Sequence, residues 1–217
     1  MKLLLHTCCA PCLIGPYHEL VSKGIAVTAF FYNPNIHPLL EFRKRIKALK
    51  TLAASGDVKL IIDEEYGLRE FLSQVDWKQA HEVRCKGCYD MRMVRTAREA
   101  VQRGFDAFST TMLASVHQHH ESVKEAGERA GKTAGIGFYY ADMRHLGEKS
   151  HEEARRRSIY RQQYCGCVFS EYERFAPTNR ELYRGSRAGD ADVSCAAEPS
   201  EGIHSRKNTE PGRANEC

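Results

Sequence analysis

Short apolar runs alternate with amphipathic stretches along the first 175 residues of the chain. The runs are continuously apolar rather than alternating, as in strands of a parallel sheet that are covered on both faces. Strands are therefore predicted over residues 3–6, 27–32, 58–63, 105–110 and 136–141.

The stretches between these runs carry apolar residues at helical spacing. Helices are predicted over residues 13–23, 39–55, 68–75, 86–103, 117–130 and 151–163. Four glycines suit the left-handed position that ends a helix: Gly24, Gly56, Gly104 and Gly131. Alternating strands and helices predict an α/β fold, a parallel sheet of about five strands with helices on both faces. Ligands of such sheets bind beyond the carboxyl ends of the strands.

The pattern stops after residue 175. Residues 176–217 hold only four large apolar side chains, at Leu182, Tyr183, Val193 and Ile203. Such a segment buries too little surface to offset the entropy of ordering. We therefore expect one catalytic domain over residues 1–175 and a disordered C-terminal tail over 176–217, with no role for Cys195 or Cys217.

Composition narrows the class of protein. The 217 residues are 28% charged and 42% hydrophobic, as in a soluble globular protein. No apolar run approaches the roughly 20 residues needed to span a bilayer, and the N-terminal apolar stretch ends after Leu5, so neither a membrane partner nor a signal peptide is expected. Nine cysteines in a chain of the reducing cytoplasm favour metal binding or redox chemistry over a disulfide scaffold.

Seven of the cysteines lie in the predicted domain, at three places where an element begins or ends. One group follows the first strand, the second opens the predicted helix 86–103, and the third closes the predicted helix 151–163. Buried structural cysteines have no such spacing, so the placement indicates chemistry. The groups are Cys8, Cys9 and Cys12; Cys85 and Cys88; and Cys165 and Cys167.

The first two groups are candidate metal ligands. Helix N-termini lower thiol pKa, and four thiolates from Cys8, Cys9, Cys85 and Cys88 suit an iron–sulfur cluster or a structural zinc. Spacing alone does not separate these two metals. Cys12 has three open roles: a ligand of a second metal, a replacement cluster ligand, or none.

The third group is a candidate redox pair. Two thiols one residue apart, at Cys165 and Cys167, can close a strained and therefore labile disulfide, and Gly166 between them gives the backbone the freedom that a tight ring needs. Additional metal ligation by this pair is the alternative. A thioredoxin-like pair of Cys9 and Cys12 is a further reading, although it leaves the other groups without a role.

Polar and basic residues extend the predicted site. Asn33, Asn35, Thr110 and Thr111 follow two strands at the edge where the first cysteines lie, and suit either substrate hydrogen bonds or turns and caps. Arginines flank the second and third cysteine groups and favour a polyanion such as RNA. They are Arg84, Arg92, Arg95, Arg98 and Arg103 in one run, and Arg155, Arg156, Arg157 and Arg161 in the other.

Taken together, the motifs resemble those of the epoxyqueuosine reductase family that works without cobalamin, the QueH type. The resemblance spans about residues 2–170, and the order of the motifs makes the combination specific. The motifs are Cys8-Cys9-Ala10-Pro11-Cys12, residues 31–38 (Phe-Tyr-Asn-Pro-Asn-Ile-His-Pro), Arg84-Cys85-x-x-Cys88, Ser109-Thr110-Thr111 and residues 160–167 (Tyr-Arg-Gln-Gln-Tyr-Cys-Gly-Cys).

The resemblance implies a nucleotide-alpha-hydrolase-like (Rossmann-like) fold, a [4Fe-4S] cluster and the last step of queuosine biosynthesis, the reduction of epoxyqueuosine to queuosine at the wobble position of tRNA. By motif, Cys165 and Cys167 are the redox-active pair, which an external electron donor must restore. A mononuclear iron beside the cluster is also implied, and Cys12 stands where some relatives carry aspartate. The implied cluster ligands are Cys8, Cys9, Cys85 and Cys88.

For the tRNA, the candidate substrate-binding residues are Asn33, Asn35, Thr110, Thr111, Arg155 and Arg161. Two other classes of protein remain possible from the residues alone. One is a thiol–disulfide oxidoreductase, and the other is a zinc-stabilised RNA-binding module. Both would be colourless, whereas an iron–sulfur enzyme is brown.

Overall fold

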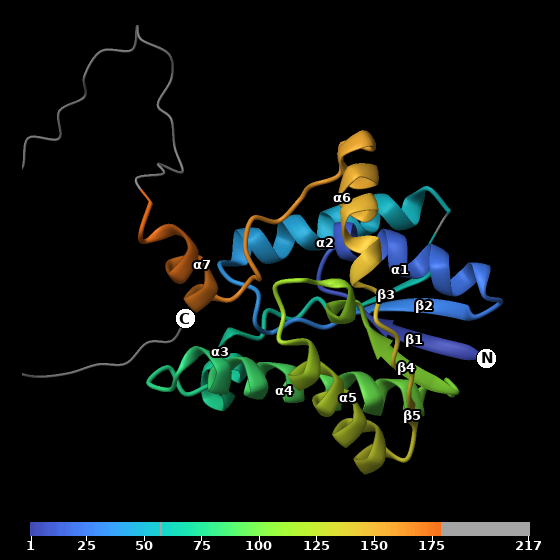
Figure 1. Ribbon diagram of the computed structural model, residues 1–217, viewed down its shortest axis with the longest axis horizontal. Helices are drawn as coiled ribbons and strands as arrows, with labels where there is room; N and C mark the ends of the chain where they lie inside the picture. The colour runs from blue at the N-terminus through green and yellow to red at the C-terminus, as the bar shows by residue number, and fades with distance from the viewer. Residues whose placement is uncertain (57, 179–217) are drawn as a thin grey trace, which may run out of the picture. The chain divides into compact units, whose positions relative to one another are not determined.

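The computed structural model describes residues 1–56 and 58–178 of the 217. Its sheet has five strands, all parallel, in the order β3-β2-β1-β4-β5 (Figure 1). The strands are β1 Lys2–His6, β2 Ala26–Phe31, β3 Leu60–Ile62, β4 Ala107–Thr110 and β5 Gly137–Phe138.

Helices cover both faces of the sheet. In Figure 1, α1, α2 and α6 lie on one face, and α3, α4 and α5 lie on the other. The helices are α1 Ala10–Ser22, α2 Leu39–Ala54, α3 Leu68–Gln74, α4 His81–Gln102, α5 His120–Ala134, α6 Gly147–Arg156 and α7 Val168–Phe175, with short 3-10 turns at Thr111–Ala114 and Arg144–Leu146. The α/β fold predicted from the hydrophobic pattern is confirmed.

Strand β1 is the centre of the core. Leu3, Leu4 and Leu5 are completely buried, because β1 pairs with β2 on one side and β4 on the other and is covered by helices above and below. From β1 the chain continues to β2 and β3 on one side of the sheet, and it then crosses to β4 and β5 on the other side. The strand order therefore reverses between β1 and β4. In open α/β sheets, ligands bind beyond the carboxyl ends of the strands at such a point.

Three helices start earlier than predicted, and one of them moves the second cysteine group. Helix α1 begins at Ala10 rather than at residue 13, α4 at His81 rather than at residue 86, and α6 at Gly147 rather than at residue 151. Cys85 and Cys88 therefore lie in the second turn of α4 instead of opening it. The prediction failed because residues 81–85 are polar on most faces, and helical spacing is visible only further along.

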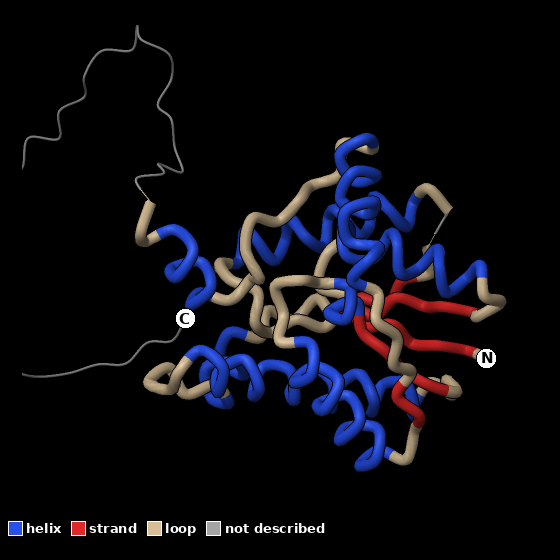
Figure 2. The backbone as a smooth tube through the Cα atoms, viewed as in Figure 1, coloured by secondary structure: helices blue, strands red, loops and turns tan. Residues whose placement is uncertain are grey.

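The third cysteine group was also placed wrongly. Helix α6 ends at Arg156, and a long loop over residues 157–167 leads to α7, which the sequence did not predict (Figure 2). Cys167 is the N-cap of α7, so the pair precedes a helix rather than closing one. Similarly, Gly131 lies inside α5, and the left-handed residue that ends this helix is Gly135 (φ 72°).

The C-terminal part of the chain is described only as far as residue 178. Helix α7 ends at Phe175, while the tail predicted over 176–217 falls almost wholly outside the described residues, together with Cys195 and Cys217. Within residues 1–56 and 58–178, no helix combines the length and apolar character that a membrane span requires.

Candidate functional site

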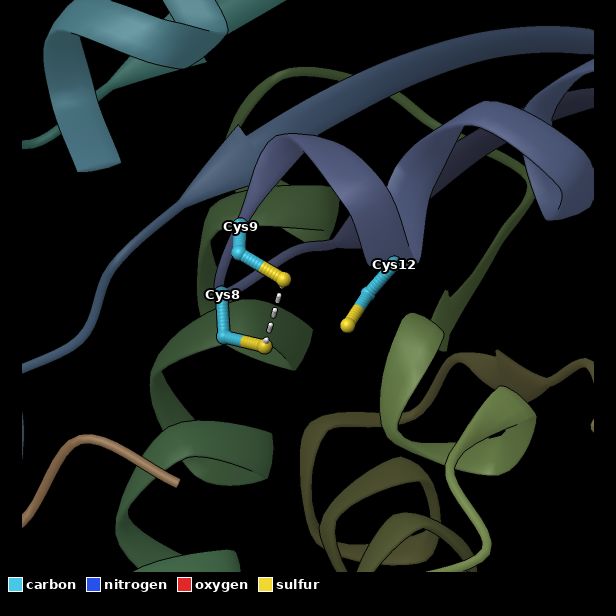
Figure 3. A group of neighbouring side chains, drawn as sticks. All are labelled: Cys8, Cys9 and Cys12. Atoms are coloured by element: carbon cyan, nitrogen blue, oxygen red, sulfur yellow. Dashed lines mark hydrogen bonds between the residues drawn. The ribbon is translucent and has the colours of Figure 1, made fainter. Parts of the chain in front are cut away.

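The first cysteine group lies where β1 ends and α1 begins. Cys9 is the N-cap of α1, and Pro11 in the first turn sets the helical backbone without losing a needed N–H. The Sγ atoms of Cys8, Cys9 and Cys12 all lie within 4.8 Å of one another, and Figure 3 shows them turned toward a common space. The Cys8 and Cys9 sulfurs are 3.8 Å apart. This geometry suits a bound metal ion, and among the described residues it is the tightest such group.

These three thiols differ in acidity. Hydrogen bonds from Cys12 and Cys9 hold the pKa of Cys8 well below its usual value. Burial raises the pKa of Cys9, and the hydrogen bond to Cys8 raises that of Cys12. Binding a metal would therefore have to displace the protons that Cys9 and Cys12 hold more strongly than Cys8 does.

The second and third groups line one pocket. Cys85 and Cys88 reach it from α4, and Cys165 and Cys167 reach it from the loop before α7. Its apolar wall includes Phe71 of α3 and Phe169 of α7. Burial raises the pKa of Cys88 to about 12 and also raises the pKa of Cys85. Such thiols become strong ligands only when a metal removes their protons.

The Cys165–Cys167 pair is asymmetric. A hydrogen bond from Cys167, helped by the charges of Arg92 and Arg45, lowers the pKa of Cys165 to about 6 against the effect of burial. The same hydrogen bond, with burial, raises the pKa of Cys167. The Cys167 sulfur also accepts a hydrogen bond from the Ser170 N–H at 3.3 Å. One reactive thiolate beside one protonated thiol is the arrangement that dithiol redox chemistry uses.

Two buried arginines stand between the cysteine groups. Arg45 of α2 and Arg92 of α4 are 1% and 2% exposed. Burial alone would lower the pKa of Arg92, but charge interactions with the sulfurs of Cys88, Cys165 and Cys8 raise it. Arg92 also lines the pocket of the second and third cysteine groups, where its Nε donates to the Cys88 carbonyl at 3.2 Å.

Arg45 was missed by the sequence analysis, and Arg92 was assigned to a surface patch. A usable indication was present for Arg45, which lies on the buried stripe of α2 with Phe42 and Leu49, four residues after a buried Glu41. A charged residue on an apolar helix face needs a buried partner, so it marks a site.

The four polar residues predicted to touch substrate are all buried. The Asn33 amide donates to the Thr7 carbonyl at 2.8 Å, and the Thr110 hydroxyl caps the turn Thr111–Ala114 by accepting from the Met112 N–H at 3.1 Å. The side chains of Asn35 and Thr111 keep polar atoms without a partner among the described residues. Cap chemistry therefore explains Thr110, while Asn35, Thr111 and the Oδ1 of Asn33 have no hydrogen-bond partner among the described residues.

The His6 ring is held by hydrogen bonds to residues at the carboxyl ends of β2 and β4. Its Nε2 lies 3.1 Å from the Tyr32 carbonyl, which can only accept, so Nε2 carries the proton and Nδ1 accepts from the Thr110 hydroxyl at 2.9 Å. Burial lowers the pKa of His6 to about 4. His6 is therefore a neutral structural residue with both nitrogens engaged.

The predicted basic runs are mostly paired within the protein. Arg95 and Arg103 both bond Glu99, Arg84 bonds Glu173 of α7, and Arg156 and Arg157 bond Glu153. Arg155 and Arg161 are exposed, and within the described residues neither forms an ion pair. Both lie near His151, whose pKa burial and these two charges lower. Fewer arginines are therefore available to an anionic partner than the sequence indicated. Those that are exposed and without an ion pair among the described residues include Arg98 as well as Arg155 and Arg161.

Acid should destabilise the site through His37, which is packed between the rings of Tyr66 and Phe71. Burial lowers the pKa of His37 from 6.5 to about 4. The neutral ring is favoured in the folded state, so this stabilisation is complete above pH 6.5 and is lost as the pH falls toward 4. Between pH 7 and pH 4.5 we expect a loss of roughly 2 kcal/mol.

Urea unfolding followed by circular dichroism at pH 7 and pH 4.5 measures this loss. His37→Phe should flatten the pH dependence, while His18→Phe, at an exposed histidine of α1, should leave it unchanged. If the free energy of unfolding of the His37→Phe protein depends on pH as strongly as that of the wild type, the prediction is wrong.

A parallel α/β domain that gathers thiols of unequal acidity at the carboxyl edge of its sheet defines a class, the cysteine-based redox or metal enzymes. The comparison with known proteins narrows this class. Residues 3–173 match the family model described as "Epoxyqueuosine reductase QueH". The chain belongs to this family and is an oxidoreductase with a role in queuosine biosynthesis, as the resemblance of its motifs implied.

Curated relatives agree with the family match. A protein of Dehalococcoides mccartyi is 39% identical over 178 residues, which cover 82% of this chain and 97% of the relative. A protein of Thermotoga maritima is 36% identical over 181 residues, which cover 79% of this chain and 91% of the relative. Both are named epoxyqueuosine reductase QueH.

Proposed function

We propose that this protein reduces epoxyqueuosine to queuosine at the wobble position of tRNA in the cytoplasm, using a [4Fe-4S] cluster and the Cys165–Cys167 dithiol. The observation that carries the proposal is the grouping of the seven thiols: Cys85, Cys88, Cys165 and Cys167 line one pocket with Arg92, and the sulfurs of Cys8, Cys9 and Cys12 lie within 4.8 Å of one another. A generic disulfide reductase needs two thiols, and a zinc module needs four, whereas seven thiols with two buried guanidiniums suit a cluster and a separate redox pair.

The donor set fits the cluster in chemistry and charge. Thiolates are the ligands that iron–sulfur clusters require, and Cys8 and Cys9 with Cys85 and Cys88 supply four. Arg45 and Arg92 offset the negative charge that four buried thiolates would concentrate. When bound, the cluster supplies single electrons and an iron that polarises the epoxide oxygen.

Cys12 is proposed as the ligand of the additional iron. Its sulfur lies within 4.8 Å of those of Cys8 and Cys9, and it accepts a hydrogen bond from the Gln162 amide at 3.4 Å. The Cys12 sulfur, in the first turn of α1, is turned toward the sulfurs of Cys8 and Cys9 (Figure 3). A thiolate is a suitable iron ligand at this position.

The electron balance of epoxide reduction supports the dithiol as the two-electron donor. Converting the epoxide to an alkene takes up two electrons and two protons and releases the oxygen as water. Oxidation of the Cys165 and Cys167 thiols to a disulfide supplies both electrons and both protons. An external dithiol reductant must then reduce the disulfide, which closes the cycle.

We propose that the tRNA approaches the protein from the side that carries Arg155 and Arg161. Arg155 and Arg161 are exposed and suit backbone phosphates, which bind Arg and Lys through charge. Asn35 and Thr111, with free polar atoms at the sheet edge, are proposed to bond the modified base, and Asn33 and Thr110 to hold the loops that carry them.

The test is anaerobic purification followed by iron, sulfide and zinc analysis. We expect a brown protein with about four sulfides and four to five irons per chain, together with conversion of epoxyqueuosine in tRNA to queuosine under a chemical reductant. A colourless zinc protein without this conversion would favour an RNA-binding module. A metal-free protein that reduces generic disulfides would favour a thiol–disulfide oxidoreductase.

A further inference from the structure

A single guanidinium ties the dithiol segment to α2. The Arg45 Nη1 donates to the Cys165 carbonyl at 2.9 Å and the Nη2 donates to the Tyr164 carbonyl at 3.0 Å. Its Nε donates to Glu41 Oε1 at 2.7 Å. All three contacts use the planar fork of an arginine that is 1% exposed.

Further hydrogen bonds hold the same segment. Tyr160 donates to the second carboxylate oxygen of Glu41, which therefore bonds both Arg45 and the loop. The His37 N–H donates to the Gly166 carbonyl at 2.7 Å, and the Tyr164 hydroxyl donates to the His37 carbonyl. The loop is thus fastened to α2 and to the residues that precede it, on both sides of Cys165.

The fit around Gly166 is close. Its φ is +131°, which side chains rarely adopt, and a Cβ there would lie 3.0 Å from Ile36 Cγ1 and 3.2 Å from Arg45 Nη1. The backbone of the pair is therefore pressed against the guanidinium. Only glycine allows this approach, which explains the Cys-Gly-Cys spacing.

We infer that Arg45 is a positioning residue for the redox pair: its fork fixes the carbonyls of Tyr164 and Cys165 so that the Cys165 thiol faces Cys8 and Arg92. The inference rests on the dithiol role in the proposed function. A buried ion pair with Glu41 would need no contact with the dithiol backbone, yet two of the three Arg45 contacts go there. The guanidinium charge also acts on Cys8 and Cys9, so one side chain serves both cysteine groups.

Arg45 holds the segment with both thiols reduced. Releasing the fork should therefore weaken the dithiol form relative to the disulfide. In a glutathione buffer the exchange is balanced, because two thiols pass two electrons and two protons to glutathione disulfide, which becomes two glutathione molecules. The equilibrium between dithiol and disulfide thus reports on Arg45 directly.

The experiment compares Arg45→Lys with the wild-type holoenzyme. Lysine keeps the charge but offers no planar fork. Alkylation and mass spectrometry of the Cys165–Cys167 peptide in glutathione buffers should show a shift toward the disulfide of about tenfold, or about 30 mV. The kcat for epoxyqueuosine tRNA should fall about 10- to 100-fold with little change in KM, since misplacement affects the reacting geometry rather than binding.

Arg43→Lys is the matched control, at an exposed arginine of the same helix, and should match the wild type in both measurements. Tyr160→Phe removes one hydroxyl of the network and should shift the equilibrium in the same direction by a smaller factor; it carries the test if Arg45→Lys does not fold. The inference is overturned if the dithiol–disulfide equilibrium and the kcat of Arg45→Lys both stay within twofold of the wild type. It is also overturned if the substitution lowers only the thermal stability. The proposed function can also fail on its own. If the wild-type protein leaves epoxyqueuosine unchanged but Arg45→Lys still shifts the dithiol equilibrium, the proposed function is overturned and this inference is not.

Discussion

Replacing Cys88 by serine is expected to abolish the proposed iron–sulfur cluster. Cys88 is 7% exposed, and burial raises the pKa of its thiol to about 12, so the site has no solvent ligand ready to replace it. A serine hydroxyl is a far weaker iron ligand than a thiolate. We expect sulfide to fall from about four to less than about one per chain, with loss of the brown colour and of epoxyqueuosine reduction.

Cys12→Ser provides the matched comparison. If Cys12 holds only the additional iron, this variant keeps about four sulfides and four irons and loses the extra iron alone. Iron and sulfide assays with visible absorption spectra measure both variants, and circular dichroism checks that the fold remains. A Cys88→Ser protein with its full sulfide would remove Cys88 from the ligand set, while sulfide loss in Cys12→Ser would place Cys12 within it.

The sheet could be predicted from the sequence because a strand that is buried on both faces consists of consecutive apolar residues. Strands such as β1, with three consecutive buried leucines, are continuous apolar runs bounded by polar turns. The shortest strands, β3 and β5, were predicted too long at both ends. Flanking residues still bond the neighbouring strands, since the Ala29 N–H donates to the Lys59 carbonyl and the Tyr139 N–H donates to the Phe108 carbonyl, but they lie outside the regular ladder. The apolar pattern does not mark where that ladder ends.

The site was predictable only in part. Cysteine spacing along the chain identified the three groups, since thiol chemistry restricts residue type. It could not show that the loop 157–167 crosses to α2, because the contacts of Arg45 with Tyr164 and Cys165 join residues about 120 positions apart. Nor could it show that Arg84 of α4 is paired, because its partner Glu173 belongs to a helix that the sequence did not predict.

This long-range anchoring explains why an apparently independent pair of thiols depends on the rest of the site. Cys165 lies in a loop, which would ordinarily be the least constrained part of an α/β domain. Here α2 holds its backbone, and Arg92 of α4 acts on its sulfur. The pair is therefore held between helices from both faces of the sheet, close to the ends of β1 and β2 where the first cysteine group begins.

Loss of either thiol of the redox pair should stop turnover to the same extent. Cys165→Ser, Cys167→Ser and the double variant should each lower the multiple-turnover rate by at least about 100-fold, the scale of a lost participating group. The losses should not add, because the two sulfurs act as one two-electron donor. Cys195→Ser, at a cysteine with no predicted role, is the control and should retain the wild-type rate.

Single-turnover measurements then separate the dithiol from the cluster. Enzyme loaded with cluster and pre-reduced should convert about one epoxyqueuosine per chain without added reductant, because the dithiol stores two electrons. The Cys165→Ser protein, with unchanged iron and sulfide, should convert none. Because the hydrogen bond from Cys167 lowers the pKa of Cys165 to about 6, Cys165 is the member of this pair that iodoacetamide should modify first at pH 7. Unchanged single-turnover and multiple-turnover rates in Cys165→Ser would remove the dithiol from the mechanism and leave the cluster as the only reductant.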